Sequence, residues 1–351
     1  MSRFLSEKYK TLEAYVPGEQ PQDKEYIKLN TNESPYPPPE GVLSAITAQE
    51  ISDLRLYPDP DCRLLRSKLA ERYGLKPENI YVSNGSDDIL NFAFMAFGAD
   101  GAVFPTLTYS FYPVFANLHG VAYETVPLRE DFTLDVAEMQ GKGKLTVFPN
   151  PNAPTGIALP RAEIEDILKA NPNNVVIVDE AYVDFGGESC VPLIDQYENL
   201  LVVQTFSKSR QLAGARLGLA MGNAKLIADL NRVKFSLNPY NINRLTLKAG
   251  QAALEDTAYF DRTRAAIVDT RAWTKQQLEQ RGFAVLDSRS NFLFASTDRK
   301  DGKTLYKELK KNGILVRHFD APRIQNWLRI TIGTPEQMQT FMETLDKIME
   351  E

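Results

Sequence analysis

Residues 204–218, QTFSKSRQLAGARLG, contain a single lysine, Lys208, and an arginine, Arg216, in a stretch of small residues. Lys208 follows the apolar run LLVVQ, and Arg216 comes eight positions later. A lysine that reacts as a neutral amine needs its pKa lowered by burial or by nearby positive charge. This setting therefore predicts a reactive amine at Lys208 and an arginine that pairs with a dianion at Arg216. The alternatives are a surface lysine and an ordinary salt bridge.

A carboxylate ends another apolar run, VVIVDEAYVDF. Asp179 follows four apolar residues, and Tyr182 comes three positions later. A carboxylate at a strand end can bind a cation or hold a proton on a ring nitrogen, and the alternative is a structural carboxylate that caps the next turn. Lys208 lies 29 positions beyond Asp179, which is one strand–helix–strand step. If the two strands are neighbours, both side chains face one pocket.

A third candidate is the segment NGSDDIL, which lies between an apolar run and a helical stretch. It contains Gly85, Ser86 and Asp87. Free backbone N–H groups at a helix N-terminus bind anions, and glycine allows close approach. The alternative is an ordinary N-cap by Ser86 or Asp87.

The elements that must position these residues indicate an α/β fold. Short apolar runs alternate with helix-like stretches between about 80 and 222, which predicts a large domain with a mainly parallel sheet covered by helices. The runs are IYVSNG, GAVFP, VAYETVPL, KLTVFPNP, VVIVDEAY, LLVVQTFS and ARLGLAMG. A smaller α+β C-terminal domain is expected to follow, with a long charged helix from about 258. The expected division is an N-terminal arm at 1–40, a large domain at 41–250 and a small domain at 251–351.

Composition narrows the class of protein. The 351 residues carry a net charge of −6, with 43% hydrophobic and 25% charged residues. These values are typical of a soluble globular protein and argue against a nucleic-acid partner. No apolar run is long enough for a membrane span, and two cysteines form no disulfide framework, so a cytoplasmic location is expected. Two histidines exclude a three-histidine metal site within the chain, and no metal is expected.

Together these groups suit pyridoxal 5'-phosphate, which needs a lysine, an acid at its ring nitrogen, a donor at its phenolic oxygen and a phosphate site. The chain also resembles the aspartate-aminotransferase-like (fold type I) pyridoxal-phosphate enzymes, and among them the histidinol-phosphate aminotransferases. The matching motifs span nearly the whole chain. They are YVPGEQP, LNTNESPYPP, YPDPDCRLLR, SNGSDDIL, TYSFYPV, NPNAPTG, DEAYVDF, TFSKSRQLAGARLG, GILVRHF and LRITIGT.

The resemblance implies a role for each matching residue. Lys208 forms the Schiff base and moves the substrate's proton, and Asp179 keeps the ring nitrogen protonated. Tyr182 donates to the phenolic oxygen, and Tyr109 stacks on the ring. The residues implied at the cofactor's phosphate are Gly85, Ser86, Asp87, Ser207 and Arg216. Tyr57 is expected to reach the phosphate in a neighbouring subunit, so the resemblance implies a homodimer.

Substrate contacts are also implied. Arg329 matches the arginine that binds the amino donor's carboxylate, and Arg317 is a second anion contact with a surface ion pair as its alternative. Tyr15 and Asn32 match arm positions that line the substrate pocket. The implied reaction is transamination between histidinol phosphate and 2-oxoglutarate, in histidine biosynthesis. The alternatives are an aromatic amino acid aminotransferase and a phosphothreonine-type decarboxylase of the same fold.

One position departs from the family pattern. The last asparagine of N-P-x-N-P-T-G normally contacts the phenolic oxygen, but NPNAPTG has Ala153 there. Either Asn152 turns inward and supplies this donor, or Tyr182 serves alone. The two prolines beside this loop favour Asn152.

Overall fold

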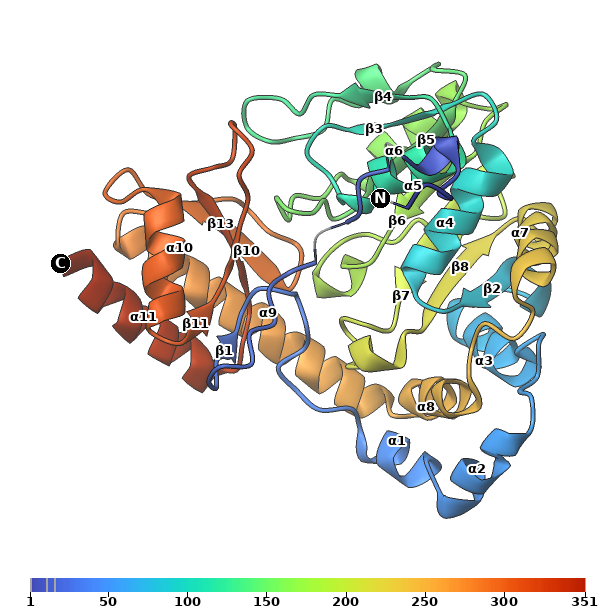
Figure 1. The fold of residues 1–351 in the computed structure, drawn as a ribbon, viewed down its shortest axis with the longest axis horizontal. Coiled ribbons are helices and arrows are strands. Elements are labelled where there is room, and N and C mark those ends of the chain that lie inside the picture. The colour runs from blue at the N-terminus through green and yellow to red at the C-terminus, as the bar shows by residue number, and fades with distance from the viewer. Residues whose placement is uncertain (1, 11, 16, 351) are drawn as a thin grey trace.

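The computed structural model describes residues 2–10, 12–15 and 17–350. Its centre is a seven-stranded sheet with the strand order β2-β8-β7-β6-β5-β3-β4 (Figure 1). All seven apolar runs form strands of this sheet. Their bounds are β2 Ile80–Ser83, β3 Ala102–Pro105, β4 Tyr123–Val126, β5 Leu145–Pro149, β6 Val176–Asp179, β7 Leu200–Thr205 and β8 Gly218–Gly222. Only β8 runs in the opposite direction to the other six strands, so the expected mainly parallel sheet is confirmed.

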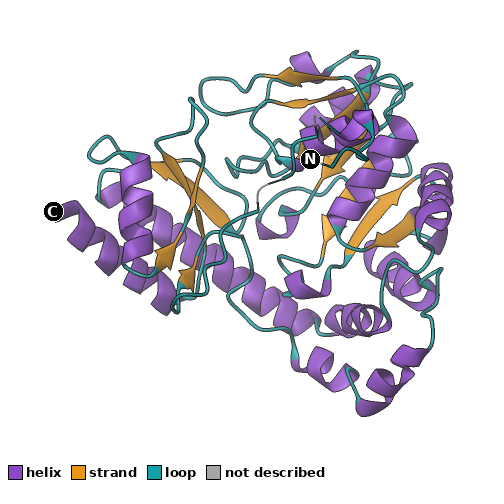
Figure 2. Ribbon diagram, viewed as in Figure 1, coloured by secondary structure: helices purple, strands orange, loops and turns teal. Residues whose placement is uncertain are grey.

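Helices cover both faces of the large sheet (Figure 2). The helices of this part of the chain are α1 Glu40–Ala45, α2 Ala48–Ser52, α3 Arg63–Tyr73, α4 Ser86–Phe97, α5 Phe111–His119, α6 Arg161–Ala170, α7 Ala224–Leu237 and α8 Arg244–Glu255. Successive strand residues point to opposite faces. Thus Val176 and Val178 pack in the core with α3, α6 and α8, whereas Ile177 packs with α4, α5 and α7.

The C-terminal part forms the expected smaller α+β unit around an antiparallel sheet of order β12-β13-β10-β9. Its elements are α9 Thr257–Gln280, β9 Ala284–Val285, β10 Phe292–Ser296, α10 Gly302–Lys311, β11 Ile314–Leu315, β12 Arg317–His318, β13 Trp327–Thr331 and α11 Pro335–Glu350. The long helix α9 begins within one residue of the expected start. The anticipated boundary at 250 falls inside α8, which packs on α1 and α3.

The N-terminal arm is more ordered than its proline content suggests. Its strand β1 (Ile27–Lys28) pairs in parallel with β11 of the small domain, as Figure 1 shows. Leu29 continues this pairing, since its N–H donates to Leu315 and its carbonyl accepts from Thr331. The arm therefore passes along the small domain before it reaches α1.

Short 3-10 turns connect several of these elements. They are Glu7–Tyr9, Asp53–Arg55, Pro77–Asn79, Ala137–Met139, Val183–Phe185, Val191–Leu193 and Ala213–Ala215. Among the described residues, we find no helix with the length and apolarity that a membrane crossing requires.

Candidate active site

The carboxyl ends of β6 and β7 bring the candidate catalytic groups to one edge of the sheet. The strands pair in parallel, with Asp179 opposite Val203. Lys208 follows β7 by three residues, so the expected adjacency of the two strand ends is confirmed. A cavity of about 910 Å³ opens here between the large sheet, the arm and the small domain. The expected site residues that line it are Tyr15, Asn32, Tyr109, Tyr182, Lys208, Arg317 and Arg329.

Lys208 is partly buried in this cavity. Its Nζ donates to the carbonyl of Thr31, 3.3 Å away, and lies 5.9 Å from the centre of the Tyr182 ring. Burial, followed by the positive charge of Arg329, lowers the pKa of Lys208 to about 8. At pH 7 roughly a tenth of this lysine is therefore a neutral amine, far more than for a solvated lysine, and the neutral form is the one that acts as a nucleophile or base.

Asp179 lies deeper, with 4% of its surface exposed. Its Oδ2 accepts a hydrogen bond of 2.9 Å from the hydroxyl of Tyr112, and its Oδ1 accepts one from Ala181 N–H. Burial raises the pKa of Asp179 to about 6, and these two hydrogen bonds oppose that rise. The carboxylate is thus suited to bind a buried cationic N–H.

Tyr112 was not singled out from the sequence. It is fully buried near the start of α5, three positions after Tyr109, and the two rings pack edge to face at 5.7 Å. The available signal was this spacing in TYSFYPV, since residues three apart lie on one side of a helical turn.

Tyr182 packs against the hydrophobic core of the small domain and also lines the cavity. It is 9% exposed, and its ring packs edge to face on Phe292 at 5.1 Å. Burial raises its pKa, so the side chain is a neutral phenol at physiological pH. Its oxygen accepts a hydrogen bond of 2.9 Å from Asn32 Nδ2.

The candidate anion site lies where α4 begins. Gly85 adopts a φ of +88° just before α4, a conformation that glycine tolerates best. A Cβ at this position would lie 2.7 Å from Arg216 Nη2, so only glycine leaves the guanidinium in place. Strand pairing explains why these distant segments lie together, because Gly218 at the start of β8 pairs with Ser83 on one side and with Thr205 on the other.

The remaining members of this anion site are in hydrogen-bonding positions. Arg216 Nη2 lies 2.9 Å from Asp87 Oδ2, and Tyr109 donates a hydrogen bond of 2.6 Å to Asp87 Oδ1. Ser207 is buried, and its backbone N–H and hydroxyl oxygen both contact the hydroxyl group of Thr205. Ser86 is the first residue of α4.

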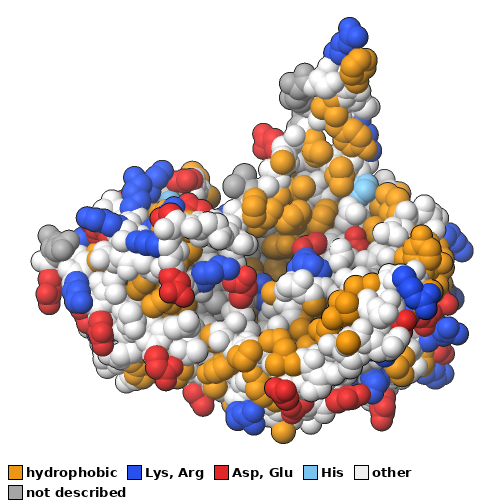
Figure 3. Space-filling model, turned by 60° about the horizontal axis from the view of Figure 1, so that its bottom comes forward, with side chains coloured by type: hydrophobic (Ala, Val, Ile, Leu, Met, Phe, Trp, Pro, Cys, Tyr) orange, Lys and Arg blue, Asp and Glu red, His pale blue; other side chains and the backbone are white. Residues whose placement is uncertain are grey.

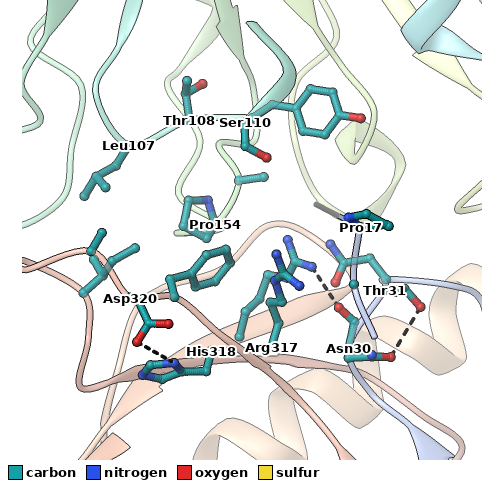
Figure 4. A pocket seen from close by; sticks show the side chains of 18 of the residues that line it. Pro17, Asn30, Thr31, Leu107, Thr108, Ser110, Pro154, Arg317, His318 and Asp320 are labelled. Carbon is teal, nitrogen blue, oxygen red and sulfur yellow. Dashed lines mark hydrogen bonds and ion pairs between the residues drawn. The ribbon is translucent and has the colours of Figure 1, made fainter. Parts of the chain in front are cut away.

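Two arginines of the small domain face the cavity. Arg329 donates from Nη2 to the carbonyl of Asn30 at 2.9 Å, and its Nε is buried without a hydrogen-bond partner among the described residues. Figure 4 shows Arg317 between His318 and the arm residue Asn30, across the cavity from Thr108. Within the part of the chain that the structure describes, neither guanidinium pairs with a carboxylate. They are therefore available for anionic groups of a ligand.

The arm and loop residues differ in their positions. Tyr15 stacks on Phe111 at 4.1 Å and lines the cavity. Tyr57 does not line this cavity; it is 78% exposed and stacks on Tyr240 at 4.5 Å. A contact from Tyr57 to the same subunit's site is thus not seen, which is compatible with the expected role in a neighbouring subunit.

Asn152 requires a correction. Its Nδ2 donates to the carbonyl of Leu107 at 3.2 Å and to the hydroxyl of Thr155 at 3.0 Å. The amide is therefore occupied in holding its own loop and does not line the cavity, whereas Ala153 does. This arrangement does not support the expectation that Asn152 turns inward to the cofactor's phenolic oxygen. Of the two alternatives, it favours the one in which Tyr182 alone would donate to that oxygen.

The residues present fit the expected cofactor. The close approach of the Gly85 backbone to Arg216 suits a phosphate, and Lys208 is a partly buried amine of lowered pKa. Asp179 offers a buried carboxylate, and the unpartnered Nε of Arg329 marks a place for a second anion. These features together define an enzyme site that handles amines bearing anionic groups.

Comparison with known proteins places the chain in a family. The family model for aminotransferase class I and II matches residues 24–345, and the chain belongs to this family. It is 49% identical over 352 residues to the histidinol-phosphate aminotransferase of Brachyspira hyodysenteriae, covering 99% of both chains. It is 50% identical to histidinol-phosphate aminotransferase 1 of Bordetella parapertussis, again over 99% of both chains.

Solved structures agree with this assignment. The histidinol-phosphate aminotransferase of Clostridium acetobutylicum superposes with a TM-score of 0.86 at 25% identity, over 92% of this chain and 99% of that one. The Sinorhizobium meliloti histidinol-phosphate aminotransferase, in complex with pyridoxal-5'-phosphate, gives a TM-score of 0.85 at 25% identity, over 93% and 92%. The expected enzyme class and fold are confirmed.

Proposed function

We propose that this protein transfers the amino group of histidinol phosphate to 2-oxoglutarate, with pyridoxal 5'-phosphate as cofactor, in histidine biosynthesis. The observation that carries the proposal is the cavity lined by Lys208, Arg317 and Arg329, at the edge of the sheet where Asp179 ends β6. The identity of 46–50% with histidinol-phosphate aminotransferases over the whole chain supports the choice of substrate.

The protein's own residues supply binding and proton transfer. When bound, the cofactor supplies an electron sink that makes the proton on the substrate's Cα removable. Lys208 Nζ, as a neutral amine, removes this proton and returns it as an acid. Because its pKa is about 8, the amine is close to the balance of the two forms that both steps need.

The other groups hold the cofactor and orient it. Asp179 would keep a proton on the ring nitrogen, and Tyr182 would donate to the phenolic oxygen. The residues that would hold its phosphate are Gly85, Ser86, Asp87, Ser207 and Arg216, and Tyr109 would stack on the ring. Asp87 already contacts Arg216, so the phosphate would share this guanidinium with a carboxylate or displace it.

Both arginines serve the alternating substrates. A planar guanidinium binds carboxylates and phosphates through paired hydrogen bonds, so one pocket can receive glutamate and then a phosphate ester. Arg329 is the partner for a carboxylate or phosphate, and Arg317 is the second anion contact. Tyr15 closes the arm side of this pocket.

A homodimer belongs to this proposal. Exposed apolar side chains gather on α1, α2 and the segment that follows them, on the face that Figure 3 brings forward. They are Leu43, Ile46, Ile51, Leu54, Leu56 and Tyr57, and Tyr240, which follows α7, stacks on Tyr57 beside them. A second copy packed on this α1–α2 band would carry Tyr57 toward the partner's phosphate site. A cytoplasmic location stays a prediction from the composition.

A substrate panel tests the proposal. We expect kcat/KM for histidinol phosphate, with 2-oxoglutarate as acceptor, to exceed the values for phenylalanine and tyrosine by at least about 10²-fold, because a site built for a phosphate rejects analogues that lack it. A preference for phenylalanine or tyrosine would identify an aromatic amino acid aminotransferase. Release of carbon dioxide from phosphothreonine would identify the decarboxylase alternative.

A further inference from the structure

Asn32 is held in a single orientation at the edge of the cavity. It is 1% exposed and has a φ of +56°, in the left-handed region that asparagine tolerates better than most residues. Its backbone N–H donates to Thr331 Oγ1 at 3.0 Å, and its carbonyl accepts from Asn291 Nδ2 at 3.0 Å. The hydrogen bonds of its N–H and its carbonyl therefore hold the backbone of Asn32 in place, and with it the start of the side chain.

The hydrogen bonds of Thr331 determine which way the Asn32 amide faces. Thr331 Oγ1 already accepts the Asn32 N–H, so its single proton is free to be donated. It lies 2.9 Å from Asn32 Oδ1, which accepts it. With this proton donated to Asn32 Oδ1, the amide oxygen faces Thr331 and the NH₂ group faces the other way. Asn32 Nδ2 then lies 2.9 Å from the oxygen of Tyr182.

This chain of donors fixes the proton of Tyr182. An amide nitrogen can only donate, so the Tyr182 oxygen acts as the acceptor in this contact. Its own O–H proton then has to point elsewhere, and we find no acceptor for it among the described residues. Tyr182 lines the cavity, so the proton is available to a ligand there.

We propose that Asn32 is a positioning residue, which directs the Tyr182 hydroxyl proton toward the phenolic oxygen of the bound cofactor. This inference rests on the proposed function, because it requires pyridoxal 5'-phosphate in the cavity. It gives Asn32 a role that differs from a direct substrate contact, since both polar atoms of its side chain are already occupied within the protein.

The role has particular weight in this chain. Ala153 stands where the family pattern has an asparagine, and Asn152 is bonded to Leu107 and Thr155. Tyr182 is then the donor that must serve the phenolic oxygen. A donor whose own oxygen accepts a hydrogen bond is a stronger donor, because the two bonds polarise one another.

A pH titration of the cofactor's visible absorbance tests this inference without reference to turnover. Asn32→Gly suits the positive φ and removes the amide. A weaker donor at the phenolic oxygen leaves that oxygen more basic, so the midpoint of the absorbance titration should rise by about one pH unit. Asn32→Asp keeps the shape but turns the donor into an acceptor, which draws the Tyr182 proton away, so the midpoint should rise at least as far.

A second background separates positioning from general damage. In Tyr182→Phe, no hydroxyl remains for Asn32 to orient, and adding Asn32→Gly should leave the midpoint where Tyr182→Phe alone puts it. Asn199→Ala is the matched control, since Asn199 is a buried asparagine whose amide bonds Leu168 and Asn171, remote from Tyr182. It should reproduce the wild-type midpoint even where thermal unfolding shows lost stability.

Each result has one meaning. A shift in the wild-type background that vanishes with Tyr182→Phe supports the inference. An equal shift in both backgrounds, or no shift in either, overturns it. If the wild-type protein does not bind pyridoxal 5'-phosphate at all, the proposed function has failed instead, which the wild-type spectrum alone reveals.

Discussion

Tyr112 and Asp179 form a hydrogen bond of 2.9 Å in which both partners are buried, and it links the first turn of α5 to the end of β6. The phenol stabilises the ionised carboxylate against the burial that raises its pKa to about 6. The pair therefore sets the charge of the group that would meet the cofactor's ring nitrogen.

The cofactor-free protein should lose stability as this carboxylate ionises. The folded-state pKa of Asp179 is raised, so the proton is held more tightly in the folded protein and stability falls as pH rises from about 4 to about 6, by at most about 3 kcal/mol. Denaturant unfolding of wild type and Asp179→Asn between pH 4 and 8 measures this difference. Tyr112→Phe should extend the loss above pH 6. Parallel curves for wild type and Asp179→Asn would contradict the raised pKa.

Lys208→Ala should abolish transamination while the protein still binds the cofactor. The proposed phosphate-binding residues Gly85 and Arg216 and the carboxylate of Asp179 remain, whereas a positioned proton-transfer group contributes on the order of 10²–10⁴ in rate. Steady-state kinetics and the absorbance spectrum after gel filtration report the two properties. Lys68→Ala, which removes a lysine ion-paired with Glu255, is the control and should behave as wild type. Turnover by Lys208→Ala within about tenfold of wild type would refute the assignment.

The amine of Lys208 should titrate well below an ordinary lysine. Burial, followed by the charge of Arg329, lowers its pKa to about 8, so the rate at which the cofactor-free protein takes up pyridoxal 5'-phosphate should rise with pH to a midpoint near 8. Arg329→Gln removes the positive charge, and the midpoint should move upward. Arg299→Gln, an exposed arginine of the same domain, should leave it in place. A midpoint near 10 in the wild type would mean that the lysine is solvated.

The two arginines should differ in their effect on the two substrates. Arg329 is held by Asn30 and has a buried, unpartnered Nε, so Arg329→Ala should reduce kcat/KM for both glutamate and histidinol phosphate, by about 2–5 kcal/mol in transition-state free energy. Arg317→Ala should impair the phosphate substrate more. Small and equal losses for Arg317→Ala would instead favour a surface role for that residue.

Tyr57 can be tested by complementation between two inactive variants. If it reaches the partner's site, mixed dimers of Tyr57→Ala and Lys208→Ala contain one site that carries neither lesion, and activity should return to a fraction of wild type. Homodimers of each variant, unfolded and refolded in the same way, provide the baseline. Verified heterodimers without activity, formed from an impaired Tyr57→Ala, would place Tyr57 in its own subunit's site.

Strand positions and strand-end residues could be predicted from the sequence because both leave local signals. Each of the seven apolar runs is a strand, and all of them except the edge strand β4 are buried. Asp179 and Lys208 stand at the carboxyl ends that parallel strands share. The direction of β8 left no such signal, because a buried strand has the same continuous apolar sequence whether it pairs in parallel or antiparallel.

Contacts between distant segments were the part that could not be predicted. The carbonyls of Asn30 and Thr31 meet Arg329 and Lys208, and no local pattern marks a backbone carbonyl as a partner. Asn152 illustrates the same limit, because its bond to Leu107 joins two loops that are 45 positions apart. Proline spacing alone carried no information about that partner.

The number of residues between β1 and Asn32 determines which arm residue contacts which group of the candidate site. At one end of this segment, Ile27 pairs with Ile314 of the small domain. At the other end, Asn30 contacts Arg329, Thr31 contacts Lys208 and Asn32 contacts Tyr182. An insertion or deletion of a single residue between β1 and Asn32 would offer each of these three groups the wrong neighbour at once. We therefore expect the number of residues between β1 and Asn32 to vary less than the irregular conformation of this segment suggests. This holds even at positions where the type of side chain can change.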